Sequence, residues 1–271
     1  MRILITGSTG FIGSNLVKFY KGVHHITTFG RHDNIVAKLE ESRPDLIINC
    51  AAEIYNQNSM FFTNVMLVRD ILEWMIENKN CQLIQLGSSS EYGPVDRPTK
   101  ETDPIQAYDM YSGTKGMATL LCQSYAAAHK VDVQIVRPYS PFGSGERPHR
   151  LFPNLWKSFK LDKPMTLKDG VHDFLYINDF VDAIDKIVNE PGRTPGEVIN
   201  ISSGQQYTNM QVFELFKYIT GKPGNVSKLN EMSTWPCWQA DISHARKKYN
   251  WMPKTTLVEG IELFLEHAQY E

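Results

Sequence analysis

Short apolar runs alternate through the first half of the chain with longer segments that carry apolar residues at helical spacing. The short runs have the length of strands buried in a parallel sheet. They lie at residues 3–5, 26–29, 45–50, 82–86 and 133–136. The longer segments predict amphipathic helices at residues 11–20, 34–41, 60–78 and 110–129. Strands and helices in alternation predict an α/β fold with a doubly wound parallel sheet.

Three glycines separate the first strand from the first helix, in the segment Thr-Gly-Ser-Thr-Gly-Phe-Ile-Gly that ends at Gly13. Unpaired N–H groups and the helix dipole favour an anion at such a junction. Gly7 permits a tight turn, Gly10 the close approach of a pyrophosphate, and Gly13 close packing of helix on strand. A glycine-rich turn without a ligand is the alternative. The flanking strand and helix favour a Rossmann-type dinucleotide site.

The second strand ends at Gly30 and Arg31, where an NAD-binding fold carries an acidic residue for the ribose 2′-hydroxyl. The planar fork of an arginine side chain matches a phosphate group. The sequence therefore predicts NADP(H) as the cofactor, with NAD(H) as the weaker choice. Two alternatives stay open: Asp33 serves the ribose in a shifted register, or Arg31 is only a surface charge.

The pattern becomes irregular after the fifth strand, because residues 139–153 contain three prolines and two glycines. We assign residues 1–165, completed by segments near 172–204, to an NADP-binding Rossmann domain. Residues 205–271, together with the loops at 141–171, are assigned to a smaller C-terminal substrate-binding region.

Composition and charge exclude several classes of protein. The chain has 271 residues, 21% of them charged, and a formal net charge of −2, so no basic excess points to nucleic acid or a membrane surface. We expect no signal peptide and no membrane-spanning stretch, and hence a cytoplasmic location. The four cysteines contain no Cys-x-x-Cys pair, which predicts free thiols and no metal site.

The spacing Tyr-x-x-x-Lys places a phenol and an ammonium on one helix face, and it occurs at Tyr111/Lys115 and at Tyr218/Lys222. The first copy follows a glycine- and serine-rich strand end, so we select it. A carbonyl that is reduced needs a proton donor. An ammonium about 4 Å from the phenol is worth ~4 kcal/mol at an effective dielectric of 20. That energy predicts a tyrosine pKa about three units below its usual value.

The Gly-x-x-Gly-x-x-Gly loop, the segment Gly-Ser-Ser-Ser-Glu-Tyr-Gly at 87–93 and the Tyr111/Lys115 pair resemble the extended, sugar-nucleotide-modifying branch of the short-chain dehydrogenase/reductase superfamily. The resemblance runs nearly from end to end. It implies that Tyr111 and Lys115 act with Ser88, or with Ser89 if the strands are aligned instead. Dehydratases of this branch carry an acid here, which Glu91 would match only after a one-residue shift.

The resemblance also implies the residues that bind the ligands. The implied cofactor contacts are Gly7, Thr9, Gly10, Phe11, Ile12, Gly13, Arg31, Cys50, Ala51, Ala52, Asn64, Tyr111, Lys115, Pro138, Tyr139 and Ser140. The implied substrate contacts are Ser90, Glu91, Arg147, Arg150 and His172, the last of which replaces an arginine of the family. For Asn64, a structural role bonded to backbone is an open alternative.

These observations predict an enzyme that uses NADPH to reduce a keto group on a nucleoside-diphosphate sugar, most specifically a 4-keto-6-deoxyhexose. A sugar-nucleotide epimerase or dehydratase is the alternative, and a non-catalytic NADP-binding protein is a remote one. The family forms dimers through two long helices, which correspond here to residues 60–78 and 110–129, so the resemblance implies a homodimer. Which nucleotide and which sugar bind is left open.

Overall fold

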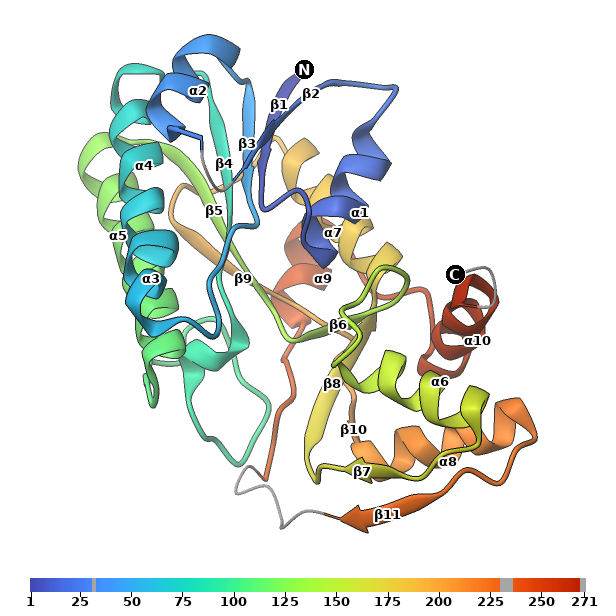
Figure 1. Cartoon of the computed structure of the whole chain (residues 1–271). Helices are drawn as coiled ribbons and strands as arrows, with labels where there is room; N and C mark the ends of the chain where they lie inside the picture. The colour runs from blue at the N-terminus through green and yellow to red at the C-terminus, as the bar shows by residue number, and fades with distance from the viewer. Residues whose placement is uncertain (31–32, 230–235, 269–271) are drawn as a thin grey trace.

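The structure is a computed structural model that describes residues 1–30, 33–229 and 236–268. Figure 1 shows a larger part built around a central sheet and a smaller part below it, which includes the C-terminal helix. The chain crosses between the two parts more than once, so each part contains segments that are far apart in the sequence.

The larger part contains a six-stranded sheet in the order β2-β1-β3-β4-β5-β9, in which all neighbouring pairs are parallel. Its strands are β1 (Arg2–Thr6), β2 (His25–Phe29), β3 (Leu46–Asn49), β4 (Gln82–Leu86), β5 (Asp132–Pro138) and β9 (Glu197–Ile201). The strand order reverses between β1 and β3, which creates the switch point where ligands of such sheets bind. The predicted doubly wound parallel sheet is confirmed.

Helices cover both faces of this sheet (Figure 1). One face carries α1 (Phe11–Tyr20) and α7 (Ile177–Asn189), and the other carries α2 (Ile35–Ser42), α4 (Leu67–Glu77) and α5 (Met110–His129). Ile3 and Ile5 of β1 belong to the same hydrophobic core as Leu16 of α1, whereas Leu4 belongs to the core that contains Val68 of α4. Because both faces are buried, the strand is a continuous apolar run.

The smaller part is built from short strands and three helices. A three-stranded sheet has the order β10-β8-β6, and a two-stranded sheet pairs β11 with β7. The elements are β6 (Ser140–Phe142), α6 (Leu151–Leu161), β7 (Met165–Leu167), β8 (Val171–Tyr176), β10 (Gln206–Thr208), α8 (Asn209–Thr220), β11 (Val226–Leu229) and α10 (Leu257–Ala268). A further helix, α9 (Ser243–Tyr249), contacts β9 of the larger sheet.

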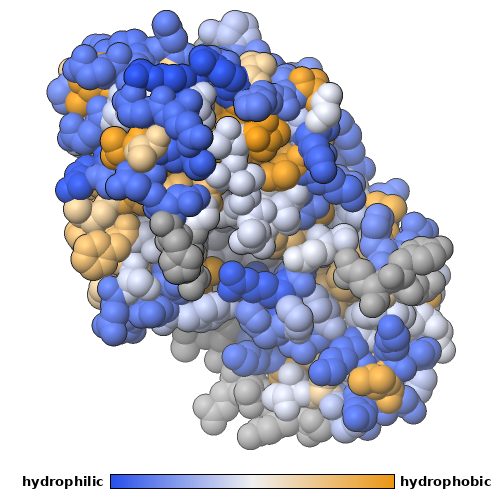
Figure 2. Space-filling model, turned by 45° about the horizontal axis from the view of Figure 1, so that its top comes forward, coloured by the Kyte–Doolittle hydropathy of each residue, from blue (hydrophilic) through white to orange (hydrophobic). Residues whose placement is uncertain are grey.

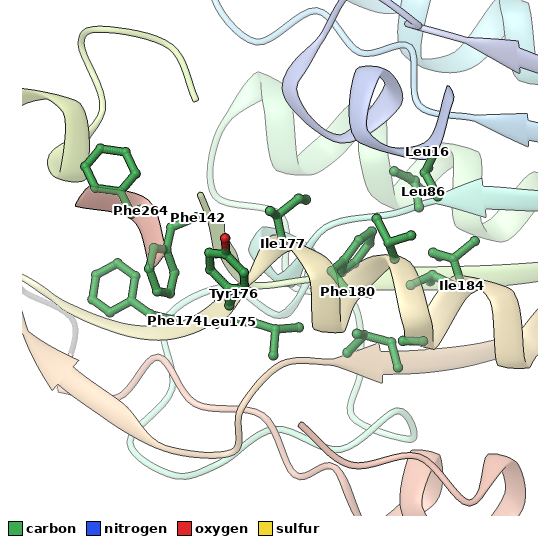
Figure 3. Packing of buried hydrophobic residues seen from close by; sticks show 14 of the residues in the cluster. Leu16, Leu86, Phe142, Phe174, Leu175, Tyr176, Ile177, Phe180, Ile184 and Phe264 are labelled. Carbon is green, nitrogen blue, oxygen red and sulfur yellow. The ribbon is translucent and has the colours of Figure 1, made fainter. Parts of the chain in front are cut away.

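One hydrophobic core joins the two parts. In Figure 3, Phe180 and Ile184 of α7 lie next to Leu16 and Leu86, and the same row continues into the aromatic residues of the smaller part. There the ring of Phe142 is stacked on Phe152 with centroids 4.0 Å apart. Because close-packed interiors deform little, this core fixes the walls of the site relative to each other.

Two local details differ from the sequence-based expectations. Residues 139–153 are not a continuous loop, because they contain β6 and the start of α6. Pro153 lies in the first turn of that helix, where its missing N–H costs nothing. The sequence also predicts Asp179 as the N-cap of a helix that runs through Val188, but the N-cap of α7 is Tyr176. Asp179 lies in the first turn and accepts the N–H groups of Lys254 and Thr255 at 3.1 and 2.8 Å.

Candidate active site

The glycine loop forms a tight cradle at the switch point of the sheet. Gly7 has a φ of +60°, and a Cβ built on it would lie 2.7 Å from the backbone carbon of Cys50. A Cβ on Gly13 would lie 2.2 Å from the carbonyl oxygen of Gly7. Gly10 is the N-cap of α1, whose first turn has no acidic residue. The backbone geometry therefore leaves room for the pyrophosphate of a dinucleotide at the start of α1.

The other predicted residues of the loop lie where α1 begins. Thr9 is exposed, and Phe11 and Ile12 are half-buried in the first turn. The neighbouring strand supplies the facing wall: the Ala51 N–H donates to the Thr6 hydroxyl at 3.1 Å, which holds the end of β3 against the end of β1. Cys50, Ala51 and Ala52 follow β3 directly and thus lie at the carboxyl edge of the sheet, beside the end of β1.

The end of β2 carries a carboxylate within the described residues. The Gly30 N–H donates to Asp33 Oδ2 at 2.7 Å, so this carboxylate lies at the strand end where NAD-binding folds hold a ribose. Arg31, on which the prediction of NADP(H) depends, lies outside the described residues.

Ser88, Tyr111 and Lys115 come together at the carboxyl end of β4. Ser88 caps the 3₁₀ helix η2 (Ser89–Tyr92), and Asp109 caps α5, which carries Tyr111 and Lys115 in its first two turns. Ser88 lies near enough to the Tyr111 phenol to lower its pKa, and the Lys115 ammonium donates to the carbonyl of Leu86. This contact favours Ser88 over Ser89 as the serine that acts with the tyrosine.

Burial dominates the titration of these groups. It raises the pKa of Tyr111 to about 12, an effect that the hydrogen bond from Ser88 opposes. Burial also lowers the pKa of Lys115, while the negative charge of Glu91 raises it. The prediction that Lys115 lowers the tyrosine pKa toward neutrality is wrong for this structure, because the ammonium is bonded to a carbonyl and the phenol is buried. Tyr111 therefore carries its proton at pH 7.

Glu91 does not face the cleft, which corrects its assignment as a substrate contact. Its side chain is completely buried. One carboxylate oxygen accepts the Ser88 N–H at 2.7 Å, and the other accepts the Thr119 hydroxyl at 2.7 Å and pairs with Arg137. Ser90, its neighbour, is also buried and donates its hydroxyl to Ser88 Oγ at 2.8 Å.

Asn64 is a second correction, because it is 1% exposed and its amide is fully engaged within the protein. It lies in the π-helical turn η1 (Phe62–Met66) between α3 (Gln57–Phe61) and α4. Its oxygen accepts the Glu53 N–H at 2.8 Å, and its nitrogen donates to the Glu53 carbonyl and to Thr114. Asn64 therefore ties the end of β3 to α5, which is the structural alternative left open by the sequence.

Three further predicted contacts, Pro138, Ser140 and His172, lie on β5, β6 and β8. Pro138 ends β5, and the Tyr139 hydroxyl is hydrogen-bonded to Thr99. Ser140 Oγ lies 3.4 Å from His172 Nδ1. Burial and, to a smaller extent, the charge of Arg150 together lower the pKa of His172 to about 4. His172 is therefore neutral at pH 7, unlike the arginine that it replaces.

The loop between β6 and α6 brings positive charge to the site. The positive charge of Arg150 lowers the pKa of both Tyr111 and His172. Arg147 of the same loop is exposed. Glu146 pairs with Arg150 at 3.3 Å, and burial raises the pKa of Glu146 to about 7.

Sequence reasoning missed one contact across the cleft. The Tyr55 hydroxyl lies 2.9 Å from His149 Nε2, which links the segment after β3 to the segment before α6. Three consecutive N–H groups, including that of Tyr55, donate to one oxygen of Glu53 and shape the turn that presents Tyr55. The two partners are far apart in the sequence, so no local pattern signals the contact.

Other site types receive no support within the described residues. No group of three or more His, Cys, Asp or Glu side chains there is arranged to hold a metal ion. No helix in the described ranges is both long and apolar enough to cross a membrane. All four cysteines are free thiols, as predicted, and only Cys50 is not fully buried.

A dinucleotide cradle at the switch point of a doubly wound sheet, next to a Ser-Tyr-Lys group, defines an extended short-chain dehydrogenase/reductase. The chain belongs to the NAD dependent epimerase/dehydratase family, whose model matches residues 3–202. It is thus an enzyme of the sugar-nucleotide-modifying type, and the resemblance seen in the sequence is confirmed.

Relatives with different reactions cover most of this chain. It is 26% identical to an uncharacterized UDP-glucose epimerase of Bacillus subtilis over 96% of each chain. It is 26% identical to GDP-6-deoxy-D-talose 4-dehydrogenase of Aggregatibacter actinomycetemcomitans over 79% of each. The crystal structure of dTDP-glucose 4,6-dehydratase from Bacillus anthracis in complex with NAD has a TM-score of 0.91, 23% identity, and coverage of 100% of this chain and 97% of that one. At this identity the likeness shows the shared fold.

Proposed function

We propose that this enzyme uses NADPH to reduce a keto group on a nucleoside-diphosphate sugar, most specifically the 4-keto group of a 6-deoxyhexose. The observation that carries the proposal is the convergence of Ser88, Tyr111 and Lys115 beside the glycine cradle. The similarity to a GDP-6-deoxy-D-talose 4-dehydrogenase supports redox chemistry at this carbon.

The mechanism assigns one task to each side chain. The reduced cofactor, when bound, supplies a hydride to the carbonyl carbon. Tyr111, which holds its proton at pH 7, transfers that proton to the carbonyl oxygen, and the product is an alcohol. Ser88 orients the oxygen by a hydrogen bond. Solvent then restores the proton to the phenolate that remains on Tyr111, and Lys115, one helical turn further along α5, would hold the nicotinamide ribose.

The substrate diphosphate would bind at the loop between β6 and α6. Arg147 and Arg150 are the cations of this loop, and arginine matches phosphate oxygens in pairs. His172 would contribute a hydrogen bond or a stacking face instead of a charge, because its pKa is lowered to about 4.

Epimerisation is the second candidate, and dehydration ranks below both. The Asp33 carboxylate at the end of β2 suits a ribose hydroxyl and hence NAD, which epimerases of this family hold and recycle. The similarity to a UDP-glucose epimerase agrees with that reading. A dehydratase needs a free acid near the tyrosine, but the carboxylate of Glu91 is enclosed by Ser88, Thr119 and Arg137.

The decisive experiment gives the enzyme a panel of nucleoside-diphosphate 4-keto-6-deoxyhexoses with NADPH. We expect oxidation of NADPH in step with formation of the 4-hydroxy sugar. Thermal-shift screening of nucleoside diphosphates selects the panel, because a ligand of the native state raises its apparent stability. Interconversion of two sugar epimers without consumption of NADPH would replace the reductase by the epimerase.

The preference for NADPH is a separate prediction that rests on Arg31. We expect tighter binding of NADPH than of NADH in fluorescence titrations. Arg31→Asp removes the phosphate partner and is expected to weaken or reverse the preference. Asp33→Asn is the matched control, because it removes the competing carboxylate and leaves Arg31 in place. Equal affinities of the unmodified protein for both cofactors would contradict the prediction.

A homodimer is the proposed assembly. Phe61, Phe62, Met117 and Leu120 are 42 to 66% exposed, and they lie on α3, η1 and α5, which contact one another. Figure 2 shows hydrophobic patches at the left edge of the molecule, over this helical layer. Exposed apolar side chains of this size on neighbouring helices suit a second copy of the chain.

We expect light scattering to give the dimer mass at micromolar concentration and the monomer mass for Leu120→Asp, because an uncompensated charge would be buried in the interface. Val23→Asp is the control, since Val23 is 75% exposed in the turn after α1, away from these helices. A monomer mass for the unmodified protein would refute the assembly.

A further inference from the structure

A fully buried ion pair lies under the catalytic serine. Arg137 of β5 donates to Glu91 Oε2 through Nη2 at 2.7 Å and through Nε at 2.9 Å. The two side chains are 2% and 0% exposed. The guanidinium also lies over the ring of Tyr92, 4.4 Å from its centroid. The ion pair therefore belongs to the protein interior, yet its acidic member, Glu91, lies in η2, the turn that Ser88 caps.

The first consequence of this pair is the position of Ser88. Glu91 Oε1 accepts the Ser88 N–H at 2.7 Å, while Ser88 Oγ accepts the Ser90 N–H at 3.2 Å. These reciprocal bonds form a capping box that closes η2. A Cβ on Gly87 would lie 2.6 Å from Glu91 Oε1, so glycine leaves room for the carboxylate.

The second consequence concerns α5 and Lys115. Glu91 Oε2 accepts the hydroxyl of Thr119, which lies four residues after Lys115 and hence on the same side of the helix. Glu91 thereby joins the turn that holds the serine to the helix that holds the lysine. Its negative charge acts on the buried ammonium of Lys115 and opposes the loss of the lysine proton that burial favours.

Stability alone does not explain the pair. Buried ion pairs are often no more stabilising than well-packed apolar residues, because both charges lose their hydration. Arg137 Nη1 has no hydrogen-bond partner within the described residues, so the desolvation of the guanidinium is incompletely compensated. A role in the neighbouring site accounts for keeping two charges there.

We propose that Glu91 is a positioning residue of this active site: it fixes Ser88 through η2 and holds a negative charge against Lys115. The inference rests on the proposed function only in its choice of Ser88, Tyr111 and Lys115 as the reacting group. It does not depend on which sugar binds, so it is testable without a substrate.

The test is Glu91→Gln, which keeps an oxygen acceptor for the Ser88 N–H and removes the charge. The titration of Lys115 is followed by NMR on lysine labelled at the side chain, with Lys115→Met to assign the signal. Removing a nearby negative charge destabilises the ammonium, so the pKa of Lys115 is expected to fall by about one unit or more. With the substrate in hand, kcat should fall ~10-fold while the dissociation constant of NADPH stays within about twofold.

Asp132→Asn is the matched control, because Asp132 pairs with Arg193 at 2.7 Å at the other end of the same strand, β5. It is expected to lower the melting temperature without moving the Lys115 titration. If Glu91→Gln does not fold, the double variant Glu91→Gln/Arg137→Met removes the orphaned guanidinium as well. The same downward shift is expected there, since Glu91 and not Arg137 acts on Lys115.

An unchanged Lys115 titration in the folded variant would overturn the proposal and leave Glu91 a purely structural residue. The two conclusions separate cleanly. If Glu91→Gln lowers the pKa of Lys115 but the unmodified enzyme reduces no 4-keto sugar, the proposed reaction is refuted and the positioning role is kept. Normal reduction of a 4-keto sugar by a Glu91→Gln variant whose Lys115 pKa is unchanged would refute the positioning role and keep the proposed reaction.

Discussion

Tyr111→Phe is expected to lower kcat by ~10²-fold or more, while the affinity for NADPH stays nearly unchanged. Phenylalanine keeps the ring and the packing of the first turn of α5 but removes the hydroxyl whose pKa Ser88 lowers. Because that hydroxyl is the only group assigned to donate a proton, the loss should appear in turnover and not in cofactor binding. Steady-state kinetics and a fluorescence titration measure the two effects separately.

Tyr218→Phe is the matched control for this experiment. It changes the second Tyr-x-x-x-Lys copy, in which Tyr218 is 84% exposed and Lys222 donates to the Phe159 carbonyl at 3.1 Å. This variant is expected to leave kcat unchanged. Turnover of a 4-keto sugar nucleotide by Tyr111→Phe at the normal rate would show that the catalytic assignment is wrong.

Gly13→Ala is expected to raise the dissociation constant of the dinucleotide by ~10²-fold, which corresponds to about 2.7 kcal/mol. The added Cβ would lie 2.2 Å from the Gly7 carbonyl oxygen, a backbone atom that cannot rotate away. Relief of this contact requires α1 to move from β1, and overpacking of this kind typically costs 1–3 kcal/mol. The movement would open the cradle in which the pyrophosphate is expected to bind.

Gly113→Ala serves as the control for a methyl group added to a helix. A Cβ built on Gly113 would have the Cβ of Ala107 as its nearest neighbour, at 3.8 Å. This is an ordinary van der Waals contact, so cofactor affinity should not change. Circular dichroism and thermal melting confirm that both variants fold. If Gly13→Ala folds and binds NADH and NADPH with normal affinity, the assignment of the glycine loop to the cofactor site is wrong.

Local sequence patterns were sufficient to predict the strand and the helix that carry the candidate site residues. The predicted strand at 82–86 and the predicted helix at 110–129 have the bounds found in β4 and α5. These segments combine an apolar run or stripe with a cap or a glycine stop, and each signal acts over a few residues. The choice of Tyr111/Lys115 over Tyr218/Lys222 also came from local context, namely the strand end that precedes it.

What the sequence by itself determined is thus the sheet and the glycine turn, and it selected Tyr111 and Lys115 as the candidate tyrosine and lysine. The tertiary structure decided which way the neighbouring polar side chains face. Glu91 turns inward because Arg137, 46 residues away in the chain, supplies its counter-charge, and Asn64 is engaged by Glu53 and Thr114. A buried polar group must take its partners from whatever the fold brings near, since water cannot satisfy it, and periodicity carries no information about such partners.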